Sequence, residues 1–323
     1  MRSVLKAPIL QARSTHTVAI AILMIVVVGI AGAALVRLLE GIDWDDIQRA
    51  LARIGWHRLF AAAAVTALSY VVLTGYDVIA LRIIGRQVRY RRAALASFTS
   101  YVFSHNLGFA LLTGGTARLR IYRPAGLGIG EVAHIMVLTG ITFWSGILTL
   151  LGFGLILQPG DVAIAGMTLT YPAHAAIGAA GLAILGAAVL ALHWYRGRTL
   201  VAFGRTIPLP SVRQAALQIL LAGIDILLAA TALLVLLPDS AAGLFPALLL
   251  GYLVAIVTGL ITHAPGGVGV FEAVMLVSLP EVDRATLFAA LLAYRLIYYL
   301  VPLAIGMLAF ALHEIREARV RSA

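Results

Sequence analysis

Apolar segments of about 20 residues recur along the whole chain, and they constrain its fold more than any single motif does. They lie at about residues 17–36, 59–81, 93–112, 131–157, 172–192, 214–237, 244–262, 270–279 and 284–311. With 62% hydrophobic and 12% charged residues, a soluble domain would expose far too much apolar surface. The sequence therefore predicts an all-α polytopic membrane protein. Its first segment, Thr17–Val36, is long for a signal peptide and is expected to stay as a membrane helix.

One apolar region is interrupted by a stretch that cannot form a continuous helix. Between His263 and Glu272 it contains a proline and three glycines, namely Pro265, Gly266, Gly267 and Gly269. Broken backbone at membrane depth survives only where protein or a water-filled cavity satisfies its polar groups. A second half-helix is expected to begin near Val268 to Phe271. Glu272 would then lie in its first turn, where a carboxylate also complements the helix dipole.

A second glycine pair, Gly114-Gly115, follows the segment at 93–112, and the loop charges indicate how both breaks are arranged. If the chain crossed the membrane eight times from a cytoplasmic N-terminus, 11 Lys and Arg residues would lie inside and 12 outside, which is no bias. If 93–117 and 244–280 instead form hairpins that return to their own side, the inside has 18 and the outside five, with Arg295 in the membrane. The positive-inside rule favours the second arrangement. We therefore expect about six full spans, two oppositely oriented re-entrant hairpins, an inverted repeat and cytoplasmic termini, all in a single domain over residues 1–323.

The loop after the first segment predicts a short amphipathic helix at about residues 43–55. Asp43 is its expected N-cap, and the apolar residues that follow recur at helical spacing, namely Ile47, Ala50, Leu51 and Ile54. We expect this helix to lie on the outer interface of the membrane.

Two ionisable residues lie at the centre of apolar segments, Asp225 and Arg295. Each costs roughly 2.5–3.5 kcal/mol at a helix centre on insertion scales, so both are expected to face the protein interior. One interpretation is a structural ion pair between them, because buried charges are usually paired. The other is a polar cavity at the two breaks that also includes a wider set of charges, namely Asp77, Arg118, Glu131 and Glu272.

Several classes of function find no support in the sequence. The chain has no cysteine, and its histidines lie on separate segments, so we expect no metal site. The net charge of +10 comes from basic residues in short loops, which is typical of cytoplasmic loops rather than of nucleic-acid binding. No hydrolase, metalloprotease or nucleotide-binding motif is present in the sequence. We therefore expect neither enzyme activity nor a cofactor, and no soluble catalytic domain.

Four motifs in combination resemble a known family. They are Tyr76-Asp77 before a basic loop, Gly114-Gly115-Thr-Ala-Arg118, Pro265-Gly-Gly-Val-Gly-Val-Phe-Glu272 and Tyr294-Arg295-Leu-Ile-Tyr-Tyr299. The chain resembles, from about residue 17 to 311, the N-terminal flippase domain of the lysylphosphatidylglycerol synthase/flippase family, the multiple peptide resistance factor of bacteria. The resemblance implies an inner-membrane protein that moves aminoacylated phosphatidylglycerol to the outer leaflet and so repels cationic peptides. The synthase helices and the soluble aminoacyl-transfer domain of the complete enzyme are not expected here.

The resemblance also implies a role for each buried charge. Lysylphosphatidylglycerol presents one phosphodiester anion and two amines, so its headgroup needs both signs of charge. Arg118, Arg295 and the half-helix N-terminus after Gly269 are assigned to the phosphate. Asp77, Asp225 and Glu272 are assigned to the amines. The implied partners are the phospholipid and the bilayer, and a separate lipid aminoacyltransferase or a second copy of the chain remains open.

Two alternatives to a lipid flippase remain at this point. A secondary transporter of a small solute shares the broken helices and the buried charges. An accessory membrane scaffold for a lipid-modifying enzyme would use the same charges only to hold its helices together.

Overall fold

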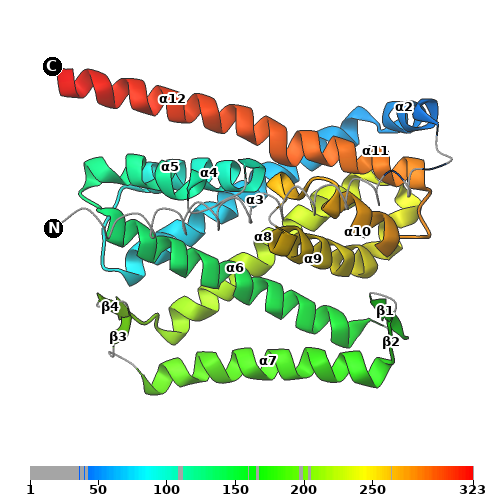
Figure 1. Ribbon diagram of the computed structural model, residues 1–323, viewed down its shortest axis with the longest axis horizontal. Helices are drawn as coiled ribbons and strands as arrows, with labels where there is room; N and C mark the ends of the chain where they lie inside the picture. Colours follow the sequence, from blue (N-terminus) through cyan, green and yellow to red (C-terminus); the bar gives the residue numbers. More distant parts are fainter. Residues whose placement is uncertain are drawn as a thin grey trace, which may run out of the picture.

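The computed structural model describes residues 36, 40, 43–107, 112–158, 160–164, 167–195, 199–202, 205–262 and 264–322 of the 323. Within them the chain is helical apart from two short antiparallel β-hairpins (Figure 1). The predicted membrane helix at 17–36 lies outside the described residues except for Val36. The elements in chain order are α2 (Trp44–Arg53), α3 (Trp56–Ile83), α4 (Tyr90–Leu107), α5 (Thr113–Tyr122), η1 (Arg123–Ala125), α6 (Ile129–Leu157), β1 (Val162–Ile164), β2 (Met167–Leu169), α7 (Tyr171–Trp194), β3 (Thr199–Ala202), β4 (Arg205–Pro208), α8 (Val212–Leu236), η2 (Asp239–Leu244), α9 (Phe245–Thr262), η3 (Pro265–Gly267), α10 (Val270–Ser278), α11 (Arg284–Tyr294), η4 (Arg295–Leu300) and α12 (Val301–Ser322).

Six helical stretches in the described residues are long and apolar enough to cross a bilayer, which confirms an all-α polytopic membrane protein. Five of them coincide with predicted spans, namely α3, α6, α7, α8 and the stretch Arg284–Arg319. The sixth, Asp239–Thr262, is the first arm of the predicted second hairpin. The last predicted span is not a uniform helix, because α11 and α12 are joined by the π-helical segment η4.

Helices α4 and α5 form a hairpin, and three ion pairs fix its open end. Arg92 near the start of α4 and Arg120 near the end of α5 both pair with glutamates of α12. Arg86, in the loop before α4, pairs with Glu131 in the first turn of α6. The beginning of α4 and the end of α5 therefore lie at the same end of the molecule, together with the end of α12.

Helices α9 and α10 form the second hairpin, and its open end lies at the opposite end of the molecule (Figure 1). Arg58 at the start of α3 pairs with Asp239 just before α9 at 2.8 Å. Helix α2, at the position of the expected amphipathic helix, packs against α11 at this end. Its residues Ile47 and Ala50 join the main apolar core.

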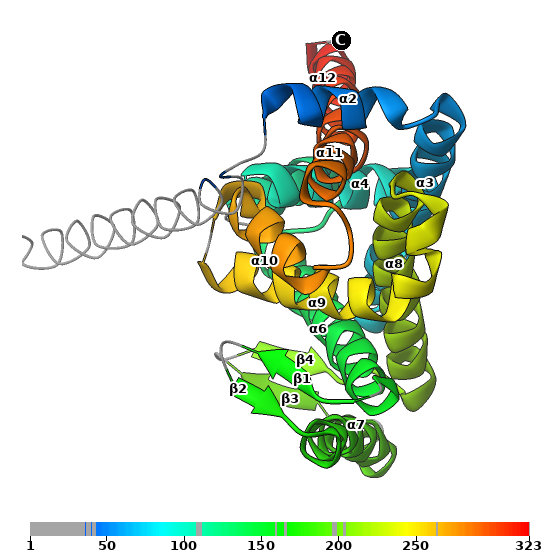
Figure 2. The same ribbon diagram turned by 90° about the vertical axis from the view of Figure 1, so that its right-hand side faces the viewer.

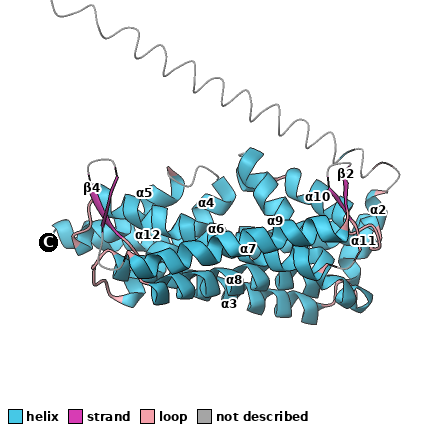
Figure 3. Cartoon of the chain, turned by 90° about the horizontal axis from the view of Figure 1, so that it is seen from below, coloured by secondary structure: helices cyan, strands magenta, loops and turns pink. Residues whose placement is uncertain are grey.

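The order of elements repeats itself with the direction reversed. A long helix, a helical hairpin and another long helix follow one another as α3, α4–α5 and α6, and again as α8, α9–α10 and α11–α12. The first members, α3 and α8, pack closely side by side, whereas α7 lies at the edge of the molecule (Figure 2). The two β-hairpins lie at opposite ends of the helices (Figure 3). Because membrane transporters place their sites between such repeats, the middle of the molecule is where a site is expected.

That both hairpins re-enter the membrane without crossing it stays a prediction, which cysteine labelling in this cysteine-free chain tests directly. Single cysteines at Arg89 and Arg120 flank the first hairpin, and those at Ser240 and Glu281 flank the second; all four positions are exposed. We expect the first two to react only from the cytoplasmic side and the last two only from outside, because of the loop charges. Labelling of position 120 only from outside would overturn the hairpin arrangement.

The structure corrects the expected role of Gly114 and Gly115. Both lie inside the first turn of α5 and are buried, and neither has a positive φ, so they do not form the break. Gly114 lies instead against α4, and a Cβ placed on it would lie 2.2 Å from Ser104 Oγ and 2.8 Å from Ser100 O. The Ser100 hydroxyl donates to the Gly114 carbonyl at 2.7 Å. Glycine is therefore required at Gly114 because the two helices approach closely there.

Gly114→Ala is expected to destabilise the protein by about 1–3 kcal/mol, because backbone or rigid side chains must move to admit the methyl group. Gly140→Ala in α6 is the matched control, since a Cβ there would meet nothing within 4 Å. Thermal unfolding of both variants in detergent measures the difference. Equal melting temperatures would contradict the close approach of α4 and α5.

Candidate functional site

The first buried charge pair joins α3 to α5. Arg118 Nε donates to both carboxylate oxygens of Asp77 at 3.3 and 3.1 Å, and its Nη2 donates to Oδ1 at 2.8 Å. The Tyr122 hydroxyl donates to Asp77 Oδ2 at 2.7 Å. Asp77 is fully buried and Arg118 is 3% exposed, although Asp77 is close to the end of its helix in sequence. A fork of this kind, out of water, is the strong form of an arginine–carboxylate interaction.

The second pair joins the hairpin break to the π-helical segment. Arg295 Nε donates to Glu272 Oε1 at 2.6 Å, and its two terminal nitrogens donate to the carbonyls of Gly266 and Gly267. The other carboxylate oxygen of Glu272 accepts the backbone N–H of Gly269 at 2.8 Å. Glu272 therefore both caps α10, as its position in the first turn predicted, and holds the arginine. Together the two side chains satisfy the polar backbone that the break exposes.

The backbone of this break is non-helical as predicted. Gly266, Gly267 and Gly269 adopt positive φ values of 62°, 62° and 80°, which side chains with a Cβ rarely adopt. Pro265 begins the short η3 turn, and α10 starts at Val270, inside the expected range.

Asp225 lies in the middle of α8 and has a different environment. The Ser69 hydroxyl donates to its Oδ1 at 2.6 Å, and the Tyr76 hydroxyl donates to its Oδ2 at 3.3 Å. Among the described residues no Lys, Arg or His forms a salt bridge with it. The alternative of an Asp225–Arg295 ion pair is wrong, because the break brings Glu272 to Arg295 instead.

The end of α4 lies against the break of the second hairpin. A Cβ built on Gly266 would lie 3.6 Å from the His105 carbonyl and 3.5 Å from that of Asn106 near the end of α4. The Asn106 side chain donates to the Tyr299 carbonyl of η4 at 3.3 Å. The end of α4 therefore contacts both the break before α10 and the π-helical segment.

A row of aromatic rings connects the two arginines, and the sequence analysis did not identify it. The Arg118 guanidinium lies 4.9 Å from the ring centre of Tyr101, and that of Arg295 lies 4.7 Å from Tyr299. The ring of His105 lies between them, 5.8 Å from Tyr101 and 6.4 Å from Tyr299. Each guanidinium is thus held against an aromatic face, which adds about 1–2 kcal/mol where water is absent. The signal in the sequence was the gathering of tyrosines beside the buried charges.

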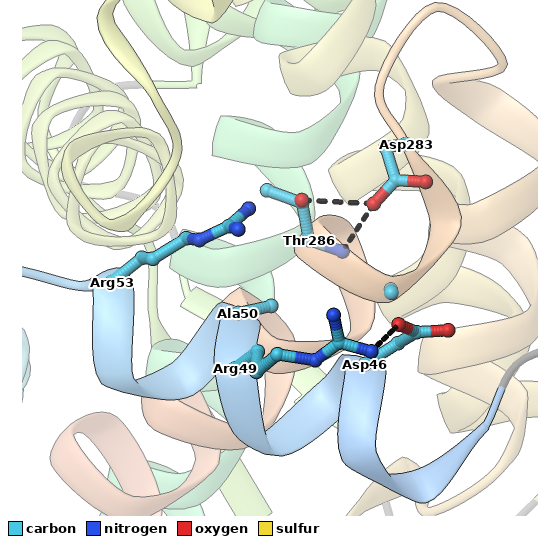
Figure 4. A pocket seen from close by; sticks show the side chains of 7 residues that line it. Asp46, Arg49, Ala50, Arg53, Asp283 and Thr286 are labelled. Atoms are coloured by element: carbon cyan, nitrogen blue, oxygen red, sulfur yellow. Dashed lines mark hydrogen bonds and ion pairs between the residues drawn. The ribbon is translucent and has the colours of Figure 1, made fainter.

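One cavity in the described part of the chain lies away from these charges. A cavity of about 290 Å³ lies at one end, between α2 and the start of α11. Figure 4 shows Arg49 paired with Asp46 there, and Asp283 bonded to Thr286 at the helix start. None of the residues that line it belongs to the buried pairs. In this conformation the protein itself therefore satisfies the site charges.

These features define a multi-pass membrane protein with two arginine–carboxylate pairs in its interior, one of them at the break before α10. The chain belongs to the family described as lysylphosphatidylglycerol synthase TM region, whose model matches residues 18–306. It is 32% identical over 277 residues to an uncharacterized protein of Synechocystis sp., covering 85% of each chain. It is also 29% identical over 293 residues to the inner membrane protein YbhN of Escherichia coli, covering 87% of this chain and 88% of that one. Membership of the family is therefore established, whereas the substrate has to be argued from the site.

Proposed function

We propose that this protein is a lipid flippase of the bacterial inner membrane that translocates aminoacylated phosphatidylglycerol, such as the lysyl form, or a related phospholipid with an amine in its headgroup. The single observation that carries the proposal is the presence of two arginine–carboxylate pairs in the interior, one fully buried and one largely buried at the break before α10. The family and the inner-membrane relative agree with it. No covalent step is required of the protein.

The proposed binding step is an exchange of partners. Arg118 and Arg295 each hold a carboxylate in the closed protein, and a lipid phosphodiester offers the same two-oxygen geometry to a guanidinium. The carboxylates released by that exchange, Asp77 and Glu272, would lose their cation in a site with little water. Breaking one buried pair without replacement costs about 3–5 kcal/mol. An amine in the same headgroup removes that cost.

The exchange therefore predicts which lipids are accepted. A headgroup with phosphate and amine replaces both members of a pair, whereas plain phosphatidylglycerol replaces only the carboxylate and leaves Asp77 or Glu272 uncompensated. Selectivity then arises from the penalty against the wrong lipid as much as from attraction to the right one.

Native mass spectrometry of the purified protein in micelles with equal amounts of lysylphosphatidylglycerol and phosphatidylglycerol tests this selectivity. We expect the lysyl lipid to be retained preferentially and Asp77→Asn to reduce the preference. A soluble compound with the same headgroup but no acyl chains serves as a third arm, since preferential binding of it would favour a small-solute transporter. Retention in proportion to the bulk mixture would contradict the exchange.

A further inference from the structure

Asp225 differs from the other two buried carboxylates because it has no arginine. Asp77 and Glu272 are each hydrogen-bonded to a guanidinium. The hydrogen-bond partners of Asp225 are the hydroxyls of Ser69 and Tyr76, and its exposed fraction is 6%. A carboxylate in the middle of a membrane helix without a cation costs several kcal/mol, so its charge has to be offset in some other way.

The hydroxyls around Asp225 can serve both forms of the carboxyl group. Ser69 Oγ lies 2.6 Å from Asp225 Oδ1 and 2.9 Å from the Tyr298 hydroxyl. In the contact between Ser69 and Tyr298, either hydroxyl can be the donor. A hydroxyl donates to a carboxylate and accepts from a protonated carboxyl, whereas a guanidinium can only donate. Thr66, one turn before Ser69 on α3, has a buried hydroxyl without a hydrogen-bond partner in the described structure. The cluster therefore has spare hydrogen-bonding capacity and no fixed positive charge.

The titratable groups that face Asp225 from the packed elements are phenols, which remain neutral at physiological pH. They come from α3, α4, α9 and η4, and they are Tyr70, Tyr76, Tyr101, Tyr252 and Tyr298. The next acid along α3, Asp77, is already paired with Arg118. Protonation of Asp225 therefore changes the charge of this cluster by a whole unit without an opposing ion.

We propose that Asp225 is a proton-binding site that couples lipid translocation to the proton gradient. A proton adds to one carboxylate oxygen, the carboxylate loses its charge, and the adjoining hydroxyl turns from donor to acceptor. When the proton leaves to the other side, the hydroxyl turns back. The coupling to lipid translocation rests on the proposed flippase function, whereas the proton-binding site itself rests on the hydroxyl cluster.

The π-helical segment links this cluster to the headgroup pair. Tyr298, which bonds Ser69, and Arg295, which holds Glu272, lie one turn apart in η4. The Tyr298 carbonyl accepts the Tyr70 hydroxyl at 3.1 Å, so the segment is also held from α3. Single π-helical turns are rare and recur at functional sites. A change in the Ser69–Tyr298 bond is thus transmitted through one short segment to Arg295.

The test uses the full chain in proteoliposomes with a fluorescent lysylphosphatidylglycerol analogue and a clamped membrane potential. With one proton per lipid, a gradient of one pH unit should drive up to about tenfold enrichment of the analogue in one leaflet. We expect enrichment by the wild type and by Asp43→Asn, an exposed residue without a side-chain cap bond, and none by Asp225→Asn. If translocation by the wild type does not depend on the pH gradient, the proton site is overturned and the flippase function stands.

Infrared difference spectra between acid and neutral pH provide a readout that does not depend on lipid. A band of a buried protonated carboxyl should be present in the wild type and absent in Asp225→Asn. If that variant does not purify, Asp225→Glu carries the test, and its band should change position. A band that is unchanged in the Asp225 variants would overturn the assignment to Asp225. A wild-type protein that shows the band but translocates no lipid would contradict the flippase function alone.

Discussion

Arg118→Ala should destabilise the protein by about 3–5 kcal/mol and abolish lipid translocation. The change leaves the fully buried Asp77 with the Tyr122 hydroxyl as its remaining strong partner, and an uncompensated buried charge is among the most costly defects a fold can contain. The double variant Asp77→Ala, Arg118→Ala should recover most of the lost stability, because both charges are then gone. Translocation should stay lost in the double variant, because the site no longer offers either sign of charge.

Arg120→Ala is the matched control for this prediction. It removes an arginine only two residues further along α5, one that is 57% exposed and pairs with Glu314 at the surface. Exposed pairs contribute about 0–1 kcal/mol, so stability and translocation should both change little. Chemical unfolding and lipid translocation are measured for all four proteins. A double variant with full transport would show that the Asp77–Arg118 pair is purely structural.

Arg295→Lys should lose most translocation even though it keeps the positive charge. Arg295 makes three hydrogen bonds in a planar fork, to Glu272 and to the carbonyls of Gly266 and Gly267, and an ammonium group cannot reproduce that geometry. Each lost bond to a charged group is worth about 1.5–3 kcal/mol, so loss of one or two reduces transport by roughly tenfold to twenty-thousandfold. Outer-leaflet aminoacyl lipid in cells supplied with the lipid measures this, alongside expression level and melting temperature.

Glu272→Gln separates the two tasks of that carboxylate. Glutamine can still accept the Gly269 N–H at the start of α10, so the cap is retained, but the charge toward Arg295 and toward an amine is lost. We expect a protein that folds and retains its break yet translocates poorly. Normal transport by both Arg295→Lys and Glu272→Gln would restrict the pair to a structural role.

The spans and the second break were predictable because they depend on local chemistry. A run of about 20 apolar residues has few alternatives to a membrane helix. Pro265 and the three glycines after it exclude a continuous helix whatever surrounds them, and Glu272 follows at the spacing of a first-turn cap. The buried position of Asp225 could also be predicted, because an acid flanked by apolar residues in a spanning helix has to face inward.

The partners of the charges could not be predicted, because they depend on how distant helices pack. Arg295 and Asp225 are both central in their segments, which made a pair between them plausible. The fold instead places Glu272, just after the break, beside Arg295. Gly114-Gly115 looked like a break because glycine serves both bends and close helix contacts. The aromatic row from Tyr101 to Tyr299 was missed because tyrosines in apolar segments look like ordinary core residues.

Reconstituted lipid translocation tests the central claim most directly. The purified protein is placed in vesicles with fluorescent lysylphosphatidylglycerol or fluorescent phosphatidylglycerol in one leaflet, and the lipid reaching the other leaflet is followed by quenching. The account predicts rapid transfer of the lysyl lipid, little transfer of phosphatidylglycerol, and neither in the Arg118→Ala and Arg295→Lys variants. Equal transfer of both lipids, or none of either by the folded wild-type protein, would contradict it.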